Sequence, residues 1–247
     1  MTTVGVIQAR TGSTRLPNKV LARLRSASLF ETVFRRASRA RIDQWWLATT
    51  DAAEDDGLAE LARNLGMSVY RGQNFDVLSR FEAIAGETNA AWILRVTADN
   101  PYTDSHVIDF LMESVRRASP LVEYCGEFPP RRFPFGYVPE LIRSDALESA
   151  RARISIEEKF HYSHVTSFTR QTGHVISPTF GDEWPRRPDW RWTVDTRLDL
   201  EAAREAFGLF GEDEFSIDYR QMVAALDRRA DIVKINASVQ QKAIEEE

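Results

Sequence analysis

Short apolar runs alternate with amphipathic stretches through the first 120 residues of the chain, and this alternation limits the possible fold more than any other feature. The run over residues 3–9 (TVGVIQA) is typical of a buried strand. Further strands are expected over 45–49, 68–70 and 91–96, and helices over 29–37, 53–65, 77–85 and 106–118, the last with Ser105 as its N-cap. Strands and helices in this order predict an α/β fold with a mostly parallel central sheet and helices on both faces.

The second half of the chain is less regular. Residues 128–135 (FPPRRFPF) are rich in proline and aromatic residues, which favours a loop or an edge segment. Helices are expected over 144–150, 156–169, 198–207 and 218–228, strands over 190–194 and 232–235, and fraying over 245–247. Because no repeat, low-complexity tract or linker divides the sequence, we expect one domain over residues 1–247.

Composition and charge exclude several classes of protein. The chain of 247 residues has a formal net charge of -5, whereas general nucleic-acid binders are usually basic, so no nucleic-acid partner is expected. Its single cysteine, Cys125, cannot form an internal disulfide and is expected in the core. The first residues do not resemble a signal peptide, and no apolar run approaches the roughly 20 residues that span a bilayer. We therefore expect a soluble, cytoplasmic protein without membrane insertion.

A polar turn follows the first expected strand, where ligands bind in open α/β sheets. It holds cations, hydroxyls and a glycine within ten residues: Arg10, Gly12, Ser13, Thr14, Arg15 and Lys19. The glycine allows close approach of an anion, and the hydroxyls and cations suit a polyphosphate. The turn matches neither the Walker A nor the G-x-G-x-x-G pattern. From these residues alone, a polyphosphate site and a solvated basic loop are equally favoured.

Two aspartates, Asp99 and Asp195, each follow an expected strand at the start of a loop. Carboxylates at the same edge of a sheet can converge, and a pair of them suits Mg²⁺, which also takes water and substrate phosphates. The alternative is that Asp99 caps the turn before Pro101 and Asp195 caps the helix that follows it. For either residue alone capping is favoured, and Asp104 and Asp199 are interpreted as structural.

Several motifs occur in a fixed order along nearly the whole chain. They are IQARTGSTRLPNKVL (7–21), RG (71–72), DVLSR (76–80), RVTADNP (95–101), HVT (164–166), RWTVDT (191–196), DL (199–200), INA (235–237) and QK (241–242). Each is weak alone, but the ordered set resembles the cytidylyltransferases that activate acidic sugars. Within them it most closely resembles the spore-coat polysaccharide biosynthesis protein F group.

The resemblance implies a Rossmann-like nucleotide-diphospho-sugar transferase fold of the GT-A type. It also implies Mg²⁺-dependent transfer of CMP from CTP to an acidic sugar or similar acid acceptor, with release of pyrophosphate, for a surface polysaccharide. Residues 1–120 would then bind the nucleotide, and residues 121–247 would bind the acceptor and form a homodimer. Positioning and charge neutralisation would carry the rate, because little covalent chemistry is asked of the protein.

The resemblance also points to individual residues. It implies that Lys19, Arg10 and Asp99 are catalytic and that Asp99 and Asp195 hold the Mg²⁺. Nucleotide contacts are expected, from the resemblance or from the ends of the expected strands, for Ala9, Arg10, Gly12, Ser13, Arg15, Lys19, Thr50, Asp76, Arg80 and Thr97. For Asp76 and Arg80, an N-cap followed by an ordinary amphipathic helix is equally favoured.

The acceptor side departs from the family pattern. Glu140 matches one carboxylate of an Asp-x-Glu pair, but Val138 stands where the aspartate is expected, so the acceptor is not fixed by the sequence. Asn18 replaces a glycine before the loop lysine, a mild change because asparagine tolerates left-handed geometry. His164 belongs to a family motif and is expected to contact substrate, whereas His161, three residues earlier, is expected to be packed.

Two alternative functions remain at this point. A glycosyltransferase of the same fold would use a nucleotide-sugar donor and usually carries an Asp-x-Asp motif, whereas this chain has only Asp99-Asn100-Pro101. A non-catalytic nucleotide-binding or scaffold protein is slightly favoured by Val138 and opposed by Lys19, Asp99 and Asp195. Measured turnover separates the last alternative from the enzymes.

Overall fold

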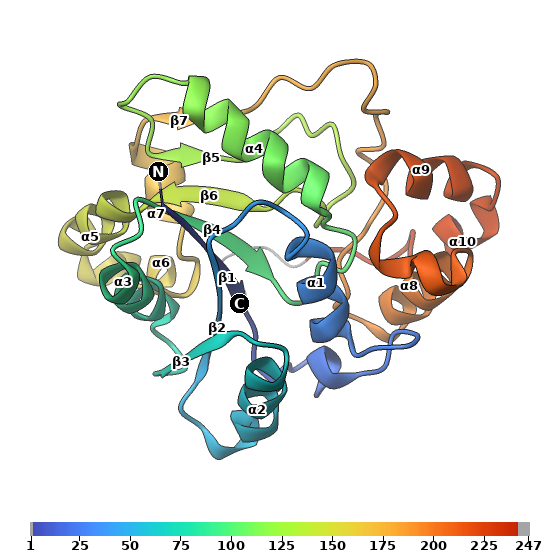
Figure 1. Ribbon diagram of the computed structural model, residues 1–247, viewed down its shortest axis with the longest axis horizontal. Helices are drawn as coiled ribbons and strands as arrows, with labels where there is room; N and C mark the ends of the chain where they lie inside the picture. Colours follow the sequence, from blue (N-terminus) through green and yellow to red (C-terminus); the bar gives the residue numbers. More distant parts are fainter. Residues whose placement is uncertain (1, 242–247) are drawn as a thin grey trace.

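The computed structural model describes residues 2–241, and its central element is a seven-stranded sheet in the order β3-β2-β1-β4-β6-β5-β7 (Figure 1). Four strands run parallel: β1 (Thr3–Gln8), β2 (Gln44–Thr50), β3 (Ser68–Gly72) and β4 (Trp92–Thr97). The rest of the sheet consists of β6 (Glu140–Arg143) antiparallel to β4, β5 (Tyr124–Cys125) antiparallel to β6, and β7 (Val175–Ile176) parallel to β5. The predicted α/β fold with a mostly parallel sheet is confirmed.

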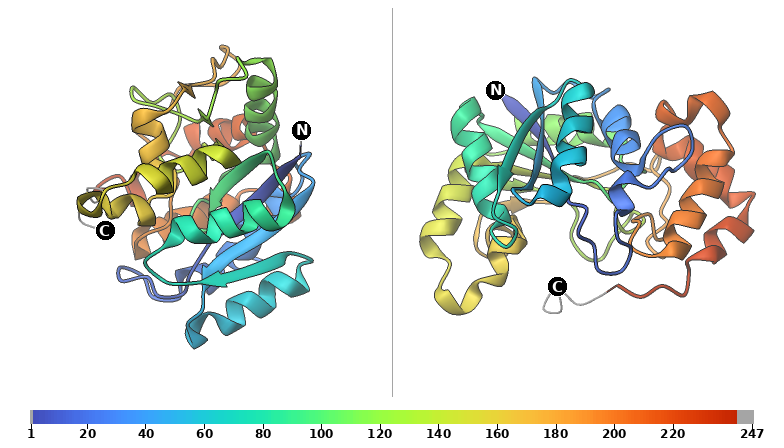
Figure 2. Two further views of the ribbon diagram at one scale, coloured as in Figure 1. Left: turned by 90° about the vertical axis from the view of Figure 1, so that its left-hand side faces the viewer. Right: turned by 90° about the horizontal axis from the view of Figure 1, so that it is seen from below.

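Apolar side chains divide between the two faces of the sheet, because successive strand residues point to opposite sides. On β1, Val4 and Val6 join one core cluster and Ile7 joins the other. The first cluster packs under α3 (Val77–Thr88), α5 (Ser144–Arg153), α6 (Phe160–Ser163) and α7 (Ser167–Thr172). The second packs under α1 (Leu29–Ala37), α2 (Asp56–Asn64), α4 (Ser105–Arg117), α8 (Arg197–Gly208), α9 (Tyr219–Asp227) and α10 (Ala230–Ile235). Helices therefore cover both faces, as predicted (Figures 1 and 2).

The expectation of a strand over residues 190–194 is wrong. Arg191 forms only an isolated bridge with Phe135, through hydrogen bonds from Phe135 N to Trp190 O (2.9 Å) and from Trp192 N to Phe135 O (2.8 Å). The ladder cannot continue because Pro134 has no backbone N–H and Gly136 has a φ of 93°. The tryptophans of this segment pack instead into an aromatic cluster, with Trp192 stacked on Tyr102 at 4.5 Å between ring centroids.

Three further expectations about local structure need correction. Residues 232–235 form part of α10 and not a strand, because a short apolar run does not distinguish the two and Ile232 packs beside α8 and α9. The helix expected over 156–169 is divided into a 3₁₀ turn (Ile156–Glu158), α6 and α7. The N-cap of α4 is Asp104, which accepts hydrogen bonds from the backbone N–H groups of residues 106 and 107, and Ser105 is the first helical residue. The fraying expected over 245–247 lies outside the described residues.

The direction of the strands determines what gathers at one edge of the sheet. β1, β2 and β4 are parallel, so their carboxyl ends lie side by side, with Gln8 paired to both Ala48 and Thr97. β6 runs the other way, and its first residue, Glu140, pairs with Arg95 near the end of β4. The loops that leave the parallel strands and the start of β6 therefore meet at the same edge.

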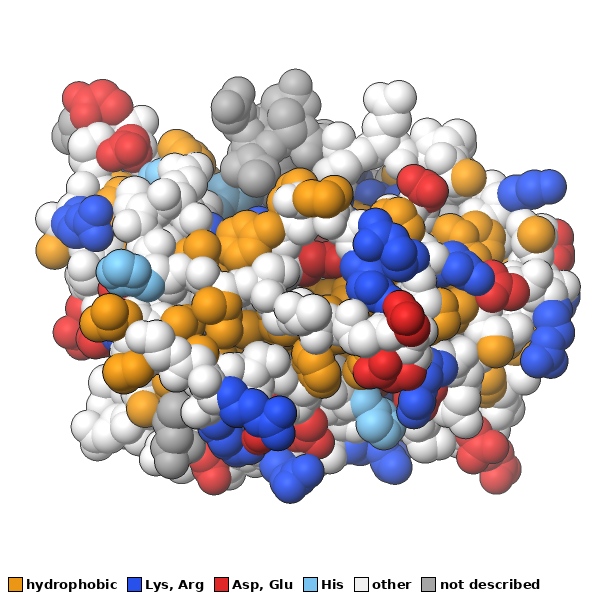
Figure 3. Space-filling model, turned by 90° about the horizontal axis from the view of Figure 1, so that it is seen from above, with side chains coloured by type: hydrophobic (Ala, Val, Ile, Leu, Met, Phe, Trp, Pro, Cys, Tyr) orange, Lys and Arg blue, Asp and Glu red, His pale blue; other side chains and the backbone are white. Residues whose placement is uncertain are grey.

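Within residues 2–241, none of the helices has the length and apolar character needed to cross a membrane. Figure 3 shows hydrophobic, acidic and basic side chains mixed on the face seen from above.

Candidate active site

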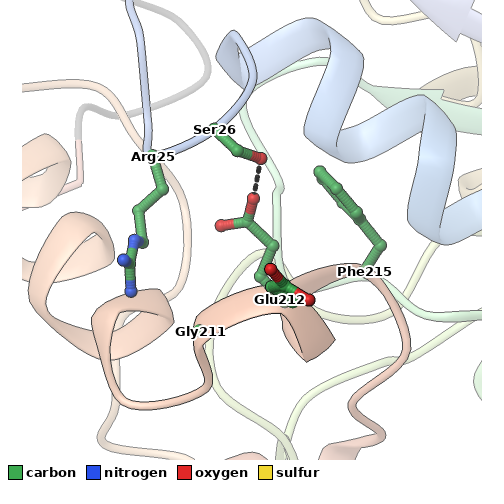
Figure 4. A pocket seen from close by; sticks show the side chains of 6 residues that line it. Arg25, Ser26, Gly211, Glu212 and Phe215 are labelled. Carbon is green, nitrogen blue, oxygen red and sulfur yellow. Dashed lines mark hydrogen bonds between the residues drawn. The ribbon is translucent and has the colours of Figure 1, made fainter.

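A cavity of about 660 Å³ lies at the carboxyl edge of the parallel strands. It brings together many of the residues expected from the sequence: Ala9, Arg10, Ser13, Arg15, Lys19, Arg80, Thr97, Asp99, Glu140, His164 and Asp195. A shallower hollow of about 560 Å³ lies between residues 25–26 and the 3₁₀ turn Gly211–Phe215, where Ser26 Oγ donates a hydrogen bond to the Glu214 carboxylate (Figure 4). Its lining contains none of the expected site residues, so the larger cavity is the candidate active site.

Lys19 joins the two aspartates that are far apart in the sequence. Its Nζ lies 2.8 Å from Asp99 Oδ2 and 2.8 Å from Asp195 Oδ1. Burial alone would lower the pKa of Lys19, but the two carboxylates outweigh it, and the pKa is raised above 10.5. Burial would likewise raise the pKa of Asp99, whereas the Lys19 ammonium lowers it below 3.8. Lys19 and Asp99 are therefore ionised at neutral pH.

Asp195 is surrounded by cations and does not cap a helix. Its Oδ1 also lies 3.1 Å from an Arg15 nitrogen, and its Oδ2 accepts a hydrogen bond from Arg191 at 2.7 Å. The N-cap of α8 is Thr196, which forms a reciprocal capping box with Asp199. The capping alternative for Asp195 is therefore wrong, and the structural interpretation of Asp199 is confirmed.

The loop after β1 is tied to the end of β2 through a buried carboxylate. Asp55 Oδ1 accepts hydrogen bonds from Thr11 N and Thr11 Oγ1, both at 2.7 Å, and Asp55 Oδ2 accepts from the Thr50 hydroxyl. Burial would raise the pKa of Asp55, but these hydrogen bonds lower it, so the carboxylate stays ionised. Asn18 closes the loop with a left-handed backbone at φ 57°, and its N–H donates to Thr11 O at 3.0 Å. The expectation that asparagine could replace glycine here is confirmed.

Three residues expected to contact the nucleotide do not line the cavity. Thr50 is buried with its hydroxyl on Asp55. Gly12 faces Glu54, and a Cβ on Gly12 would lie 2.9 Å from Glu54 Oε1. Asp76 caps α3 by accepting from Ser79 N at 2.9 Å, as the alternative interpretation proposed. These three residues shape the surroundings of the site.

The end of the cavity where the acceptor is expected from the sequence is organised around Glu140. Its carboxylate pairs with Arg95, lies 3.5 Å from an Arg170 nitrogen, and accepts hydrogen bonds from Tyr124 Oη at 2.7 Å and Thr166 Oγ1 at 3.0 Å. Burial would raise the pKa of Glu140, but the two guanidinium groups and the hydrogen bonds lower it below 4.5. Glu140 is therefore an ionised carboxylate that is already well provided with partners.

Several cavity residues were not expected from the sequence, namely Asn74, Phe75, Tyr124, Arg170 and Gln241. Phe75 is 82% exposed, and only its position between β3 and the Asp76 cap could have indicated a site role. His161 lies elsewhere, buried with Nδ1 at 2.6 Å from Ser167 Oγ, so it is packed, as expected. Cys125 is fully buried, which confirms it as a core residue.

Two pairs of arginines, Arg131-Arg132 and Arg186-Arg187, lie in the proline-containing stretches 128–134 and 184–188 and bind mainly to the protein itself. Arg132 donates to Trp184 O at 2.9 Å, and Arg187 lies 2.6 Å from an Asp227 oxygen. Arg131 is the exception, because it lines the cavity beside Phe135, with its guanidinium carbon 4.6 Å from the ring centroid.

A metal ion at Asp99 and Asp195 would find two carboxylates that already share one cation, Lys19 Nζ. Across residues 2–241 there is no group of three or more histidine, cysteine, aspartate or glutamate side chains arranged to hold a metal. The other ligands would therefore be water and phosphate oxygens, which is the coordination that Mg²⁺ commonly takes in proteins. The donor set fits Mg²⁺ in this respect.

Comparison with known proteins now identifies the chain. Residues 4–132, from the start of β1 to the loop beyond β5, match the sequence profile of the family described as cytidylyltransferase. The chain belongs to the cytidylyltransferase family. This membership makes the protein a CTP-dependent nucleotidyltransferase and favours nucleotidyl transfer over the glycosyltransferase alternative.

Relatives of this cytidylyltransferase bear out the resemblance. The spore coat polysaccharide biosynthesis protein SpsF of Bacillus subtilis is 29% identical over 233 residues, which cover 92% of this chain and 94% of the relative. The 3-deoxy-manno-octulosonate cytidylyltransferase of Solibacter usitatus is 32% identical over 108 residues, 43% of this chain and 42% of the relative. A cytidylyltransferase structure from Leptospira borgpetersenii superposes with a TM-score of 0.87 at 22% identity, covering 98% of this chain and all of that one. The last likeness confirms the nucleotide-transferase fold.

Proposed function

We propose that this cytidylyltransferase transfers CMP from CTP to an acidic sugar or a similar acid, with release of pyrophosphate, in the synthesis of a surface polysaccharide. The observation that carries the proposal is the Lys19–Asp99–Asp195 cluster, which opens into a cavity flanked by cations at both ends. The names of the relatives, polysaccharide biosynthesis for one and acid-sugar cytidylyl transfer for the other, support the same reaction.

The nucleotide end of the cavity supplies charge for a triphosphate. Arg10, Ser13 and Arg15 line it on the loop after β1, where they would bind the β- and γ-phosphates. An acceptor oxygen would form a bond to the α-phosphorus while the bond from that phosphorus to the α,β-bridging oxygen breaks. The leaving pyrophosphate would carry away the electron pair, and Lys19 would stabilise its developing charge. Ala9, Arg80 and Thr97 line the same end and would border the nucleoside.

Asp99 and Asp195 would hold the Mg²⁺, which supplies charge neutralisation at the phosphates when bound. In the structure, the Lys19 ammonium binds both carboxylates and lowers the pKa of Asp99, which favours the ionised state needed for metal binding. When phosphates enter, the Lys19 ammonium can exchange a carboxylate for a phosphate oxygen with little change in side-chain position.

The acceptor end favours an anion. Three arginines line it, Arg95, Arg131 and Arg170, whereas the carboxylates there are Glu127 and the ion-paired Glu140. Glu127 is engaged by the backbone N–H groups of residues 132 and 133, at 2.7 and 2.9 Å. The surplus of positive charge suits a carboxylate or phosphonate on the acceptor. Val138 also lines this end, so the missing carboxylate of the family pattern changes the acceptor site directly.

The decisive experiment measures pyrophosphate release with CTP and Mg²⁺ against a panel of 2-keto acidic sugars and phosphonates, with UTP, ATP and GTP as controls. We expect release that requires CTP and one class of acid, and that is lost in Asp99→Asn. Pyrophosphate release that does not depend on the acid, or that is equally fast with UTP, would contradict the proposal. Absence of both turnover and CTP-dependent thermal stabilisation would leave a scaffold protein.

Three broader features belong to the same proposal. We place the reaction in the cytoplasm, where CTP is supplied. We propose one domain over residues 1–247, with the nucleotide half in 1–120 and the acceptor half in 121–247. The homodimer implied by the sequence resemblance remains a prediction, and light scattering at several protein concentrations tests it.

A further inference from the structure

Arg191 is held at every nitrogen of its guanidinium group. Its Nε donates to Asp199 Oδ1 at 2.9 Å, one terminal nitrogen donates to Gln241 Oε1 at 2.9 Å, and the other donates to Asp195 Oδ2 at 2.7 Å. The Arg191 side chain is 9% exposed. A planar guanidinium with three different partners has one orientation, so Arg191 approaches Asp195 from a fixed direction.

Asp199, the second partner of Arg191, is itself fixed. It is 1% exposed and accepts hydrogen bonds from the backbone N–H groups of Asp195 at 3.1 Å and Thr196 at 2.9 Å. The side chain of Asn236 donates to Asp199 Oδ1 at 2.8 Å and to the Arg191 carbonyl at 3.1 Å. The cluster thus joins the start of α8 to the chain that follows α10.

The chain after α10 returns to the active site. Asn236 directly follows α10 and is 5% exposed, and Gln241 lines the same cavity as Lys19 and Asp99. In the view from below, this segment runs beneath the helices α8–α10 toward the loop after β1 (Figure 2). A segment that comes last in the sequence therefore reaches the residues that the parallel strands present.

We propose that residues 236–241 complete the active site, with Asn236 and Gln241 acting through Arg191 to set the orientation of Asp195. Arg191 engages Asp195 Oδ2 and leaves Oδ1 to face Lys19 and the cavity. Asp195 therefore presents only one of its two carboxylate oxygens, Oδ1, to a cation in the cavity. Arg191, Asn236 and Gln241 are positioning residues. The catalytic consequence rests on the proposed function, whereas the orientation of Asp195 stands on the contacts themselves.

A purely structural role is the competing explanation, because the same contacts also fasten the end of the chain. The two roles differ in what they change. Loss of a structural clamp lowers the melting temperature and leaves the folded enzyme active. Loss of a positioning contact lowers kcat and weakens cation binding at Asp195, while the KM for CTP changes little because Arg10, Arg15 and Lys19 are intact.

The experiment compares Gln241→Leu with Gln241→Glu, which keeps the acceptor oxygen for Arg191, and with Gln240→Leu at an exposed neighbour outside the cavity lining. Arg191→Met and Arg191→Lys test the centre of the cluster. The first three readouts are kcat, the KM for CTP and the melting temperature. The fourth is the dissociation constant of Mn²⁺ in the presence of CTP, measured from the electron paramagnetic resonance signal of free Mn²⁺.

We expect Gln241→Leu to lower kcat and weaken Mn²⁺ binding about tenfold, and Arg191→Met about a hundredfold, the range seen when an outer partner of a metal ligand is lost. Gln241→Glu and Gln240→Leu should stay within about twofold of the wild type, because the first keeps the acceptor and the second removes no contact to Arg191. If every variant binds Mn²⁺ like the wild type and only the melting temperature falls, the inference is overturned. If the wild type binds Mn²⁺ with CTP but has no turnover, the proposed function is wrong and the inference about Asp195 is not affected. In that case, weaker Mn²⁺ binding by the variants would still support the orientation of Asp195.

Discussion

The two ends of the cavity are built in different ways. The nucleotide end rests on the carboxyl ends of three adjacent parallel strands and on a loop fastened by Asp55, so its groups are placed by regular geometry. The acceptor end rests on β5 and β6, which have two and four residues, and on side chains from α7 and the loop before β6. On the proposed function, the regular strands would position the groups for nucleotidyl transfer, and the irregular segments would hold the residues that select the acceptor.

The ends also differ in how their charges are satisfied. At the nucleotide end, Lys19 is shared between two carboxylates, and on the proposed function it would exchange one of them for a phosphate oxygen. At the acceptor end, Glu140 has Arg95, Arg170, Tyr124 and Thr166 around it and has no comparable freedom. We therefore expect variants at the nucleotide end to change turnover most, and variants at the acceptor end to change acceptor affinity and stability.

The largest effect is expected for Asp99→Asn. Removing the ionised carboxylate of Asp99 should lower kcat about 10³-fold, because preorganised charge at the reacting phosphate provides a large part of the rate. The melting temperature should fall modestly, because Lys19 loses one of its two carboxylate partners and keeps Asp195. Steady-state pyrophosphate release measures the effect, and the exposed Asp145→Asn serves as the control. Activity within threefold of the wild type would show that Asp99 does not belong to the reacting centre.

Glu140→Gln tests the acceptor end. Breaking a buried ion pair leaves Arg95 without its partner and should cost about 3 kcal/mol of unfolding free energy. The KM for the acceptor should rise about tenfold, since a charged hydrogen-bond network is lost. The KM for CTP should be unchanged. Equal changes in both KM values would show that the two ends are not independent.

Thr166→Val is the matched control for that variant, because it removes one hydroxyl donor from Glu140 and leaves the arginines in place. Urea unfolding should show a loss of about 1 kcal/mol. A loss as large as that of Glu140→Gln would mean that the hydrogen bonds, and not the ion pair, maintain this end.

Thr50→Val should have a smaller effect at the nucleotide end. Thr50 acts through Asp55 on the loop after β1, so its loss should raise the KM for CTP a fewfold and cost about 1 kcal/mol. kcat should stay close to the wild-type value. Thermal unfolding and initial rates over a range of CTP concentrations measure both quantities. A large fall in kcat would place Thr50 in direct contact with substrate, contrary to its burial.

The pH dependence of the unfolding free energy allows the two ends of the cavity to be compared in the absence of substrate. The pKa of Asp99 is depressed below 3.8, so the stability it gains from Lys19 is present above pH 3.8 and is lost as the pH falls through the folded-state pKa. Glu140 behaves in the same direction, beginning below pH 4.5. We expect the stability difference between the wild type and Lys19→Met, from urea unfolding, to shrink below pH 3.8. A difference that grows in acid would contradict the pairing.

The sequence predicts the nucleotide half better than the acceptor half for a physical reason. Each of the first four strands has at least five residues, long enough to show as an apolar run, and parallel strands bring their ends together without further information. β6 (ELIR) and β5 (YC) have too few residues to show the two-residue alternation of a strand, so the sequence predicts neither of them. Residues 190–194 look like a strand because tryptophan and β-branched residues favour both a strand and an aromatic core.

The candidate site follows the same division. Arg10, Lys19 and Asp99 belong to motifs beside predicted strands, and the structure brings them into one cavity. Arg170 lies on the short helix α7, where no local pattern distinguishes it from a solvated residue. Gln241 belongs to the QK pair of the family motifs, but the sequence assigns that pair no role in the site. Thr50 and Asp76 occupy the expected places in the chain, but their side chains turn to local hydrogen bonds, which sequence position does not reveal. The catalytic and binding roles of Arg10, Lys19 and Asp99 remain predictions.

The reversed direction of β6 has a consequence for how such an enzyme can diversify. Because β6 begins where the parallel strands end, the loop over residues 126–139 delivers its residues to the reaction without belonging to any parallel strand. Phe133 and Tyr137 of that loop are fully buried in the core, whereas Arg131 and Val138 line the cavity. On the proposed function, substitutions at the two lining positions would change which acid is accepted while the core and the register of β1, β2 and β4 stay as they are.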